Sequence, residues 1–367
     1  MFEGKKLGFG LMRLPLTDAN DKGSIDIEAL KEMVDTFIEQ GFTYFDTAWM
    51  YCAFKSENAV KEALTDRYPR DRYTLTTKLH ASYLEAKEDR DRIFEEQRQK
   101  TGVDYFDYYM LHNISTKHEE KYTKIDSFKF IKDKKKEGKI KHIGISCHDS
   151  PEFLENILKN HPEIEFVQLQ INYIDWTNNT IQSMKCYEVA CKYKKSIIVM
   201  EPLKGGALVD IPNKSRKLFQ GMSPVEGAFR FILSLDNIMI ILSGMNKFEQ
   251  IKENTKIIDN FKPLTKMEYE ILNNVRNRIV CDKTIDCTYC NYCIDACSIN
   301  INIPKFFELY NTQKLLKQKH SIGMYYRNYI SKNISPSECI KCNNCIDYCP
   351  QHINIPRNLE KVLNEFE

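Results

Sequence analysis

Eight cysteines near the C-terminus repeat one spacing, in which three cysteines lie three residues apart and a fourth follows four residues later. The first copy contains Cys287, Cys290, Cys293 and Cys297, and the second contains Cys339, Cys342, Cys345 and Cys349. In this spacing three thiolates hold three corners of a [4Fe–4S] cube, and the fourth ligates the other cluster of a pair. The sequence therefore predicts two clusters, one held by Cys287, Cys290, Cys293 and Cys349 and the other by Cys339, Cys342, Cys345 and Cys297.

Paired zinc sites are the alternative interpretation of these motifs, because zinc also binds CxxC pairs. Two identical repeats whose fourth cysteine follows three intervening residues favour iron. Ser298 stands where a proline usually follows the first repeat, and Cys281 lies outside the pattern and receives no ligand role. The 13 cysteines are an odd number, and residues 1–16 lack the apolar core of a secretory signal. Metal binding in a reducing compartment, the cytoplasm, is therefore expected.

A second group of reactive side chains stands where three consecutive predicted strands end. Asp46 and Tyr51 follow the first of these strands, Lys78 ends the second, and His112 follows the third. An ammonium beside a tyrosine hydroxyl makes that hydroxyl more acidic, so that it can protonate a carbonyl oxygen. We expect Tyr51 to be the general acid, Lys78 to acidify it, Asp46 to hold Lys78, and His112 to orient the carbonyl by hydrogen bonding.

These side chains require a scaffold in which strands and helices alternate. Short β-prone runs alternate with segments whose apolar residues have helical spacing. The runs are Leu7 to Met12, Thr43 to Asp46, Tyr73 to Lys78, Tyr105 to Leu111, Lys141 to Ile145, Glu165 to Gln170, Ser196 to Met200 and Ile238 to Leu242. Such a series over about 280 residues predicts a closed (β/α)8 TIM barrel of the α/β class, with chemistry at the carboxyl ends of the strands. An open doubly wound sheet is the alternative, but residues 8–13 lack the third glycine of its dinucleotide-binding turn.

Several segments, in this order, resemble the aldo-keto reductase superfamily over roughly residues 1–280: GFTYFDTAWMY, TLTTKL, DYYMLH, IKHIGIS and EPLKGG. The resemblance implies a barrel that binds NADPH or NADH in extended form and reduces aldehydes or ketones by direct hydride transfer. It assigns the family's catalytic positions to Asp46, Tyr51, Lys78 and His112. Together with the cysteine repeats, the chain resembles the subgroup that carries a C-terminal two-cluster ferredoxin-like domain.

The resemblance also implies a set of cofactor contacts. The corresponding positions are Gly10, Met12, Ser146, Gln170, Met200, Glu201, Leu203, Gly205, Ser243, Gly244, Gln250, Glu253 and Asn254. Ser146 and Gln170 match contacts to the nicotinamide amide, with Gln168 on the same strand face as a second candidate. Gly205 lies in the segment that resembles the family's pyrophosphate-binding loop. Glu253 and Asn254 match the family's adenine contacts.

The chain departs from the family pattern at several of these positions. Cys147 replaces a common Asn, and Met200 stands where many members stack a Tyr on the nicotinamide. Gly244 and Gln250 replace the Lys and Arg that usually bind the 2′-phosphate, so we expect both NADPH and NADH to be used.

The length of the chain and its balance of charges limit the domain organisation and the classes of binding partner. The 367 residues suit a barrel at residues 1–280 and a small, helix-rich iron–sulfur domain at residues 281–367. Between the cysteine repeats, helical spacing links Phe306, Phe307, Leu309, Leu315 and Leu316.

The chain has 53 Lys and Arg residues against 51 Asp and Glu residues, and this near balance argues against nucleic acid as a partner. No apolar stretch approaches the roughly 20 residues of a membrane span. The charge run at residues 132–141 predicts a solvated helix end.

Three functional hypotheses follow. The leading one is an NAD(P)H-dependent reductase of a small-molecule carbonyl, with clusters that are structural or act in a separate reaction. The second is an electron-transfer enzyme whose clusters exchange electrons with the substrate or with a ferredoxin or flavodoxin partner. The third is a nicotinamide-binding redox sensor, against which the complete Asp, Tyr, Lys and His set argues.

Overall fold

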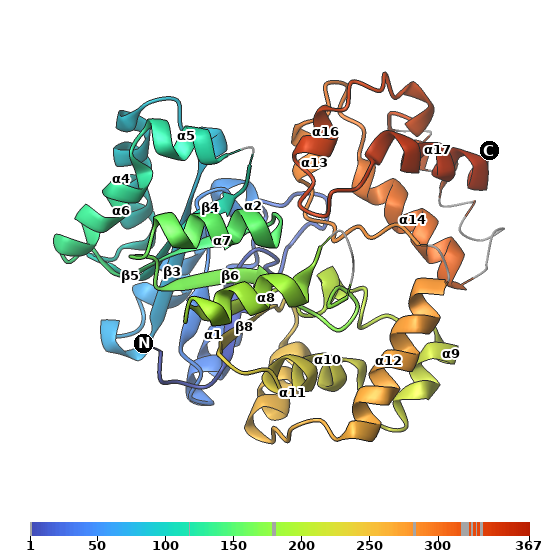
Figure 1. The fold of residues 1–367 in the computed structure, drawn as a ribbon, viewed down its shortest axis with the longest axis horizontal. Coiled ribbons are helices and arrows are strands. Elements are labelled where there is room, and N and C mark those ends of the chain that lie inside the picture. Colours follow the sequence, from blue (N-terminus) through green and yellow to red (C-terminus); the bar gives the residue numbers. More distant parts are fainter. Residues whose placement is uncertain are drawn as a thin grey trace. The chain divides into compact units, whose positions relative to one another are not determined.

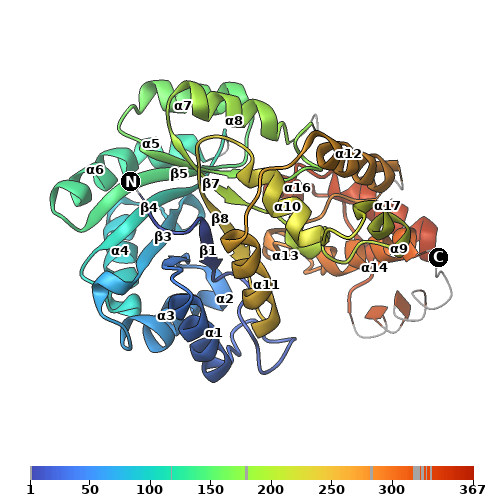
Figure 2. The ribbon, with the colours of Figure 1, turned by 90° about the horizontal axis from the view of Figure 1, so that it is seen from below.

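The structure is a computed structural model that describes residues 2–116, 118–177, 181–281, 284–316, 323, 326–327, 329–330 and 333–367. In this part of the chain, eight parallel strands close into a barrel in sequence order (Figures 1 and 2). The strands are β1 (Leu7–Gly10), β2 (Tyr44–Asp46), β3 (Thr74–His80), β4 (Phe106–Ile114), β5 (Ile140–Cys147), β6 (Phe166–Gln170), β7 (Ser196–Met200) and β8 (Ile238–Gly244). Each coincides with one of the runs expected from the sequence, so the barrel prediction is confirmed.

Helices follow the strands, and α1, α4, α6, α7 and α8 lie outside the barrel (Figure 2). The helices are α1 (Ile27–Glu39), α2 (Tyr51–Phe54), α3 (Ser56–Val60), α4 (Lys87–Thr101), α5 (Glu119–Lys124), α6 (Ser127–Lys136), α7 (Pro151–Asn160), α8 (Ser183–Lys192), α9 (Asn213–Arg216), α10 (Pro224–Leu233), α11 (Phe248–Asp259), α12 (Lys266–Cys281), α13 (Tyr292–Asp295), α14 (Ile303–Leu316), α16 (Asn344–Asp347) and α17 (Ile355–Phe366). At the start of α7 the Ser150 hydroxyl accepts a hydrogen bond from the Phe153 N–H at 3.1 Å, with Pro151 at the first helical position. Such a cap with proline next to it fixes where a helix begins.

Large apolar side chains fill the barrel. Tyr44, Tyr108, Phe166 and Ile240 pack into one buried cluster. Gly144 on β5 permits this packing, because a Cβ at that position would lie 2.5 Å from the Phe166 ring. The filled interior leaves chemistry to the carboxyl ends of the strands, as in other barrels of this kind.

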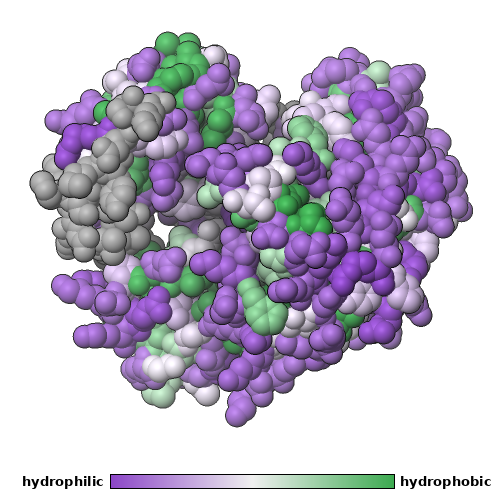
Figure 3. All heavy atoms as spheres, turned by 180° about the vertical axis from the view of Figure 1, so that it is seen from behind, coloured by the Kyte–Doolittle hydropathy of each residue, from purple (hydrophilic) through white to green (hydrophobic). Residues whose placement is uncertain are grey.

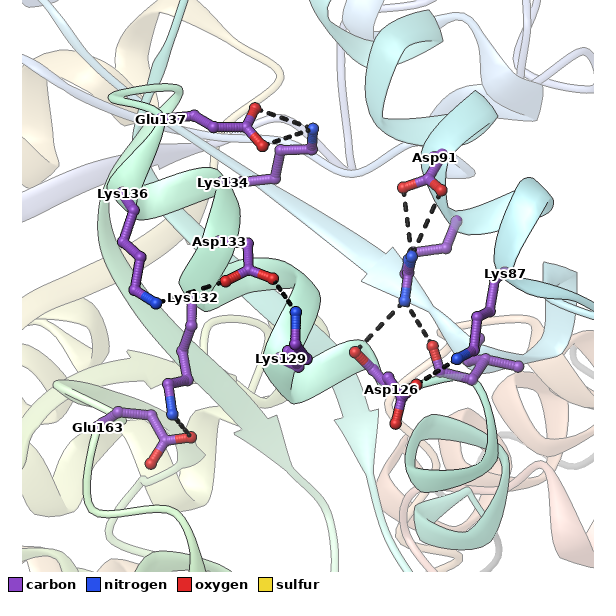
Figure 4. Close-up of polar contacts among 12 residues, drawn as sticks. Lys87, Asp91, Asp126, Lys129, Lys132, Asp133, Lys134, Lys136, Glu137 and Glu163 are labelled. Carbon is purple, nitrogen blue, oxygen red and sulfur yellow. Dashed lines mark hydrogen bonds and ion pairs between the residues drawn. The ribbon is translucent and has the colours of Figure 1, made fainter.

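The charge run at residues 132–141 covers the end of α6 and the residues that follow it. Its lysines pair with nearby carboxylates (Figure 4). The ion pairs are Lys132–Glu163 at 3.5 Å, Lys134–Glu137 at 3.0 Å and Lys136–Asp133 at 3.6 Å. Ion pairs near the surface contribute little to stability. The run is therefore the solvated helix end that the sequence predicted.

The described chain divides into two compact units. The first contains Met1–Ile171, Gln182–Pro202 and Phe229–Pro263, and so holds the whole barrel; the second contains Asn172–Ile181, Leu203–Ala228 and Leu264–Glu367. In the second unit Phe306, Phe307 and Leu309 of α14 are buried with Leu359 and Val362 of α17. The side chains of Cys281, Leu315 and Leu316 lie outside the described residues.

On the face drawn in Figure 3, hydrophilic residues predominate and apolar residues form small separate groups. In the part of the chain that the structure describes, no helix combines the length and apolarity needed to cross a membrane.

Candidate active site

A buried ion pair lies at the carboxyl ends of β2 and β3. The Lys78 ammonium is 2.5 Å from Asp46 Oδ1 and donates a second hydrogen bond to the Thr47 carbonyl oxygen at 2.7 Å. Burial disfavours both charges, lowering the pKa of Lys78 and raising that of Asp46, and the attraction within the pair opposes both shifts. The same ammonium is 4.9 Å from the centre of the Tyr51 ring, so three of the expected catalytic residues lie together.

His112 completes this group from β4. Its ring is 6.0 Å from the Tyr51 ring, measured between centroids, in an edge-on arrangement. Burial lowers the pKa of His112 well below its usual value, and the positive charge of nearby Lys78 lowers it further. The imidazole is therefore neutral near pH 7 and can donate one N–H hydrogen bond.

His80 and His118 extend the imidazole group. His80 is paired in register with His112 across β3 and β4, and its ring centroid lies 5.0 Å from that of His112 and 5.1 Å from that of His118. Burial lowers the pKa of His80 to about 3, so this ring is also neutral. His80 Nδ1 accepts from the Ser82 N–H at 3.1 Å, which places the ring proton on Nε2.

A strained turn follows Tyr51. Cys52, Ala53 and Phe54 have φ values of 51°, 52° and 67°, in the left-handed region that residues with a Cβ rarely adopt. The Cys52 thiol lies 3.6 Å from the carbonyl oxygens of Leu11 and Met12, at the end of β1. Backbone strain of this kind gathers at functional sites, and here it fixes where the Tyr51 side chain begins.

A buried polar network supports Lys78 from behind. Glu57 Oε1 accepts hydrogen bonds from Thr77 Oγ1 at 2.7 Å and Gln97 Nε2 at 3.0 Å. Gln97 Nε2 also donates to the Lys78 carbonyl oxygen at 3.0 Å, and Gln97 Oε1 accepts from the Tyr109 hydroxyl at 2.7 Å. Burial raises the pKa of Glu57 to about 7.

The positions expected to contact the nicotinamide lie at the ends of β5, β6 and β7. Ser146 is paired in register with Gln168, and Gln170 with Met200. Ser146 Oγ accepts from the Asn113 N–H at 2.7 Å, which leaves its own proton to donate. Gln168 Oε1 is buried and has no hydrogen-bond partner among the described residues. Glu201, directly after Met200, has a left-handed φ of 57°.

The positions expected to contact the adenosine end lie on β8 and α11. Asn254 Nδ2 donates to Ser243 Oγ at 3.0 Å, and both residues are buried. Gln250 Oε1 accepts from the backbone N–H groups of Asn246 and Lys247, at 2.8 and 3.2 Å, and so caps α11. Glu253 is exposed on the same helix.

Three further positions expected to contact the cofactor lie on β1, just after it, and on β8. Gly10 and Gly244 are neighbours in the register of β1 and β8, and Met12 is half-buried just after β1.

Two other expected cofactor positions belong to the loop after β7. The Leu203 carbonyl oxygen accepts from the Gly206 N–H at 2.9 Å, which folds the loop back on itself. Gly205 and Gly206 have φ values of 65° and 99°, and a Cβ at Gly206 would meet no atom within 4 Å. The backbone of this loop is therefore open to a ligand.

Cysteines of both repeats lie near one another in the second unit. One small cavity is lined by Cys287, Cys290, Cys293 and Cys349, which includes the distant cysteine of the second repeat. The members of the other set, Cys297, Cys339, Cys342 and Cys345, lie close enough for the first three to act electrostatically on Cys345. Burial raises the pKa of Cys345 to about 11, and the neighbouring cysteines add to the shift.

Residues 6–277 match the Aldo/keto reductase family, and residues 286–354 match the 4Fe-4S dicluster domain. The chain belongs to the aldo/keto reductase family. An aldo/keto reductase domain is thus followed by a 4Fe–4S dicluster domain, as the sequence predicted. The family match ends at residue 277, and the dicluster match begins at residue 286.

Curated relatives and solved structures are similar to this aldo/keto reductase over its barrel. An uncharacterized oxidoreductase of Schizosaccharomyces pombe is 27% identical over 265 residues, covering 68% of this chain and 80% of the relative. The uncharacterized oxidoreductase YqkF of Bacillus subtilis is 23% identical over 304 residues, covering 73% and 92%. Both relatives are named as oxidoreductases, in agreement with the family.

Among solved structures, the holo form of an aldo-keto reductase from Bacillus halodurans superposes with a TM-score of 0.61 at 23% identity, covering 75% of this chain and 93% of that one. An aldo-keto reductase from Klebsiella pneumoniae in complex with NADPH has a TM-score of 0.57 at 16% identity, covering 75% and 96%. At these identities the likeness concerns the fold.

Sequence reasoning missed several residues of the site. His80 could have been found, because it stands two residues after Lys78 on the same face of β3. His118 and Glu57 follow no such period, and only the folded chain places them beside the expected residues.

Proposed function

We propose that this aldo/keto reductase is an NADPH- or NADH-dependent carbonyl reductase in which Tyr51 is the general acid. The observation that carries the proposal is the position of the Lys78 ammonium, 2.5 Å from Asp46 and 4.9 Å from the centre of the Tyr51 ring. A buried ammonium at this place stabilises the phenolate that remains after Tyr51 gives up its proton. A bound nicotinamide would supply the hydride.

The residues of the chain then divide the remaining work. The neutral His112 donates its N–H to the carbonyl oxygen and holds it near the Tyr51 hydroxyl, while Asp46 keeps Lys78 in place. The buried Gln168 Oε1 suits the NH₂ group of a carboxamide, and the open backbone at Gly206 suits a diphosphate. Each feature, taken by itself, suits one part of a nicotinamide dinucleotide.

Replacing Tyr51 with Phe tests this assignment. With the clusters intact and oxygen excluded, we expect NADPH oxidation driven by an aldehyde to slow by about 10²- to 10⁴-fold in Tyr51→Phe. The matched control is Tyr68→Phe, which removes a hydroxyl bonded to Asp35 and lies outside the site. Wild-type turnover in Tyr51→Phe would show that another group supplies the proton.

The imidazoles of His80, His112 and His118 suggest the substrate class. Two of the rings are held neutral by burial, and His112, which lies next to Tyr51, is followed by His80 and then His118 at 5.0 and 5.1 Å between ring centroids. A site built to hydrogen-bond a hydroxyl discriminates against substrates that lack one. We therefore expect glyceraldehyde to be preferred over hexanal in kcat/KM, and His80→Phe to reverse the preference. An unchanged ratio would remove His80 from substrate recognition.

We further propose that the cysteines hold two [4Fe–4S] clusters, with Cys287, Cys290, Cys293 and Cys349 forming the first cluster site and Cys297, Cys339, Cys342 and Cys345 the second. The small cavity that the first four line, and the proximity of the others, support this division. Thiolate ligation of this kind suits a reducing compartment such as the cytoplasm.

Electron transfer with a ferredoxin or flavodoxin is the second candidate function. Cys342 is exposed, and the neighbouring Ile340 has 64% of its surface accessible, so the second cluster site faces solvent. An anaerobic titration with NADPH, in which the visible absorbance of the clusters is followed, separates the candidates. Bleaching without a carbonyl substrate supports electron transfer, whereas unchanged absorbance with intact carbonyl reduction supports the reductase.

A further inference from the structure

Three aromatic rings gather at the carboxyl ends of β2 and β3, from Trp49, Phe54 and Tyr83. The Trp49 ring centroid lies 4.8 Å from that of Phe54 and 5.0 Å from that of Tyr83, and the centroids of Phe54 and Tyr83 are 5.7 Å apart. All three pairs are edge-on, an arrangement that the charge distribution of aromatic rings favours. Each ring of this aromatic platform is thus held in place by the other two.

Contacts with α4 fix the Trp49 ring of the platform. Its Nε1–H donates a hydrogen bond to Glu96 Oε2 at 3.1 Å, and the Lys100 ammonium lies 5.3 Å from the ring centre. An aromatic surface that is already rigid loses little conformational entropy when a ligand covers it. The platform is therefore pre-organised for binding.

The Phe54 ring joins the platform at the end of a strained stretch of backbone. Phe54 has a φ of 67° and ends the left-handed turn that begins at Cys52. Phe54 nevertheless keeps 40% of its surface accessible, and this exposed part gains nothing from burial that would offset the strain. Backbone strain and exposed apolar surface each mark ligand sites, and here the two coincide.

The platform is continuous with the proposed catalytic residues. The Tyr83 ring lies 6.0 Å from the ring of His80, measured between centroids. His80 lies 5.0 Å from His112, and His112 lies 6.0 Å from Tyr51. A series of ring contacts therefore leads from the hydroxyl that protonates the carbonyl to the exposed aromatic surface.

We propose that the aromatic platform binds an aromatic ring of the carbonyl substrate, with Phe54 as a specificity-determining residue. The inference rests on the proposed function, in which Tyr51 and His112 hold the carbonyl group. Two imidazoles stand between Tyr51 and Tyr83 in the series of contacts, so the ring of the substrate lies a few bonds away from the carbonyl carbon. The substrate class is therefore an aldehyde that carries an aromatic ring on a short chain.

Two aldehydes of equal length test the platform. 3-Phenylpropanal and 3-cyclohexylpropanal differ in whether their six-membered ring is aromatic. In steady-state kinetics of the full-length, cluster-loaded protein with NADPH and without oxygen, we expect Phe54→Leu to lower the ratio of their kcat/KM values. The expected factor is about two- to tenfold, the usual contribution of one aromatic pair. Turnover of glyceraldehyde, which has no ring, should not change.

The matched control is Met267→Leu. It exchanges an apolar side chain on α12 that is 64% exposed and does not belong to the platform. We expect this variant to keep the wild-type ratio for the two aldehydes.

Equilibrium binding locates the contact independently of turnover. The chain has two tryptophans, so Trp176→Phe leaves Trp49 as the single tryptophan reporter. The probes are 3-phenylpropanol and 3-cyclohexylpropanol, added without nicotinamide. We expect 3-phenylpropanol to change the fluorescence of Trp49, and Phe54→Leu to weaken its binding by the same two- to tenfold while leaving 3-cyclohexylpropanol unaffected.

The outcomes separate this inference from the proposed function. An unchanged kcat/KM ratio in Phe54→Leu overturns the inference, and so does an equal loss for glyceraldehyde, which would show that Phe54 serves the fold. If Phe54→Leu keeps the ratio but turns a dimer into a monomer in light scattering, the platform is a contact between copies of the chain and the inference is wrong. If the wild type reduces no aldehyde but Trp49 still reports binding that depends on Phe54, the proposed function fails and the ring-binding site stands. If neither turnover nor binding is observed, both fail.

Discussion

Replacing Glu57 with Gln tests the buried network behind Lys78. Glu57 is completely buried, and its pKa is raised from 4.5 to about 7, chiefly by burial. The folded protein therefore keeps a proton that the unfolded chain releases, so this residue makes the protein less stable as the pH rises from 4.5 towards 7. Since one pKa unit corresponds to 1.36 kcal/mol, the full loss is about 3 kcal/mol, of which about 2 kcal/mol falls between pH 5.5 and pH 8.

A glutamine side chain cannot ionise, so Glu57→Gln should lose this part of the pH dependence. We expect the free energy of unfolding of the variant to exceed that of the wild type by about 2 kcal/mol more at pH 8 than at pH 5.5. Anaerobic urea unfolding followed by circular dichroism measures the difference at the two pH values. The matched control is Glu62→Gln, which replaces an exposed carboxylate on the turn that follows α3 and should follow the wild type.

A clear result would contradict this reasoning. If Glu57→Gln loses as much stability as the wild type between pH 5.5 and pH 8, Glu57 is ionised in the folded protein throughout that range. The hydrogen bonds from Thr77 and Gln97 would then outweigh burial in setting its charge.

Other substitutions test the remaining parts of the molecule. Lys78→Met should slow carbonyl reduction by about 10²- to 10⁴-fold and, by leaving Asp46 buried alone, lower the free energy of unfolding by about 3–5 kcal/mol; adding Asp46→Asn should restore stability without restoring activity. Cys349→Ser should bind about half as much iron as the wild type, because this residue is expected to hold one of two clusters. Elemental analysis measures the iron, and a full iron content in the variant would refute that assignment. Ser298 Oγ lies 3.7 Å from Cys342 Sγ, and Ser298→Ala should lower the midpoint potential of the second cluster by about 20–40 mV, the worth of one hydrogen bond to a thiolate. Potentiometry that shows no shift would mean that the contact does not reach the cluster.

The barrel could be predicted because its strands carry a local signal. A strand buried on both faces is often a short apolar run, and Ile197, Ile198 and Val199 of β7 form such a run. The helix start at Ser150-Pro151 is equally local, since a capping hydroxyl and a proline act on their own turn. The cysteine spacing is also a local signal, and it predicts which distant thiol would join each cluster.

Other features of the site arise only from tertiary contacts. The sequence around Glu57 does not indicate that Thr77 and Gln97 donate hydrogen bonds to its buried carboxylate, because those residues are 20 and 40 positions away. Gln250 is a predicted cofactor contact, and the structure adds that its side-chain Oε1 caps α11, a role for which Gln at the third helical position is well suited. The left-handed turn after Tyr51 is likewise invisible, since Cys and Ala seldom adopt it without outside support.

The pairing of β3 with β4 has a consequence for how the chain tolerates mutation. Lys78 lies opposite Met110, and His80 lies opposite His112. Because neighbouring residues of a strand face opposite sides, removing a single residue within β3 would turn the residues beyond the gap to the other side. The ammonium and the imidazole would leave the site together, whereas a deletion in the loop at residues 18–24 would disturb neither. Insertions and deletions within β3 should therefore inactivate variants of this chain far more often than substitutions do.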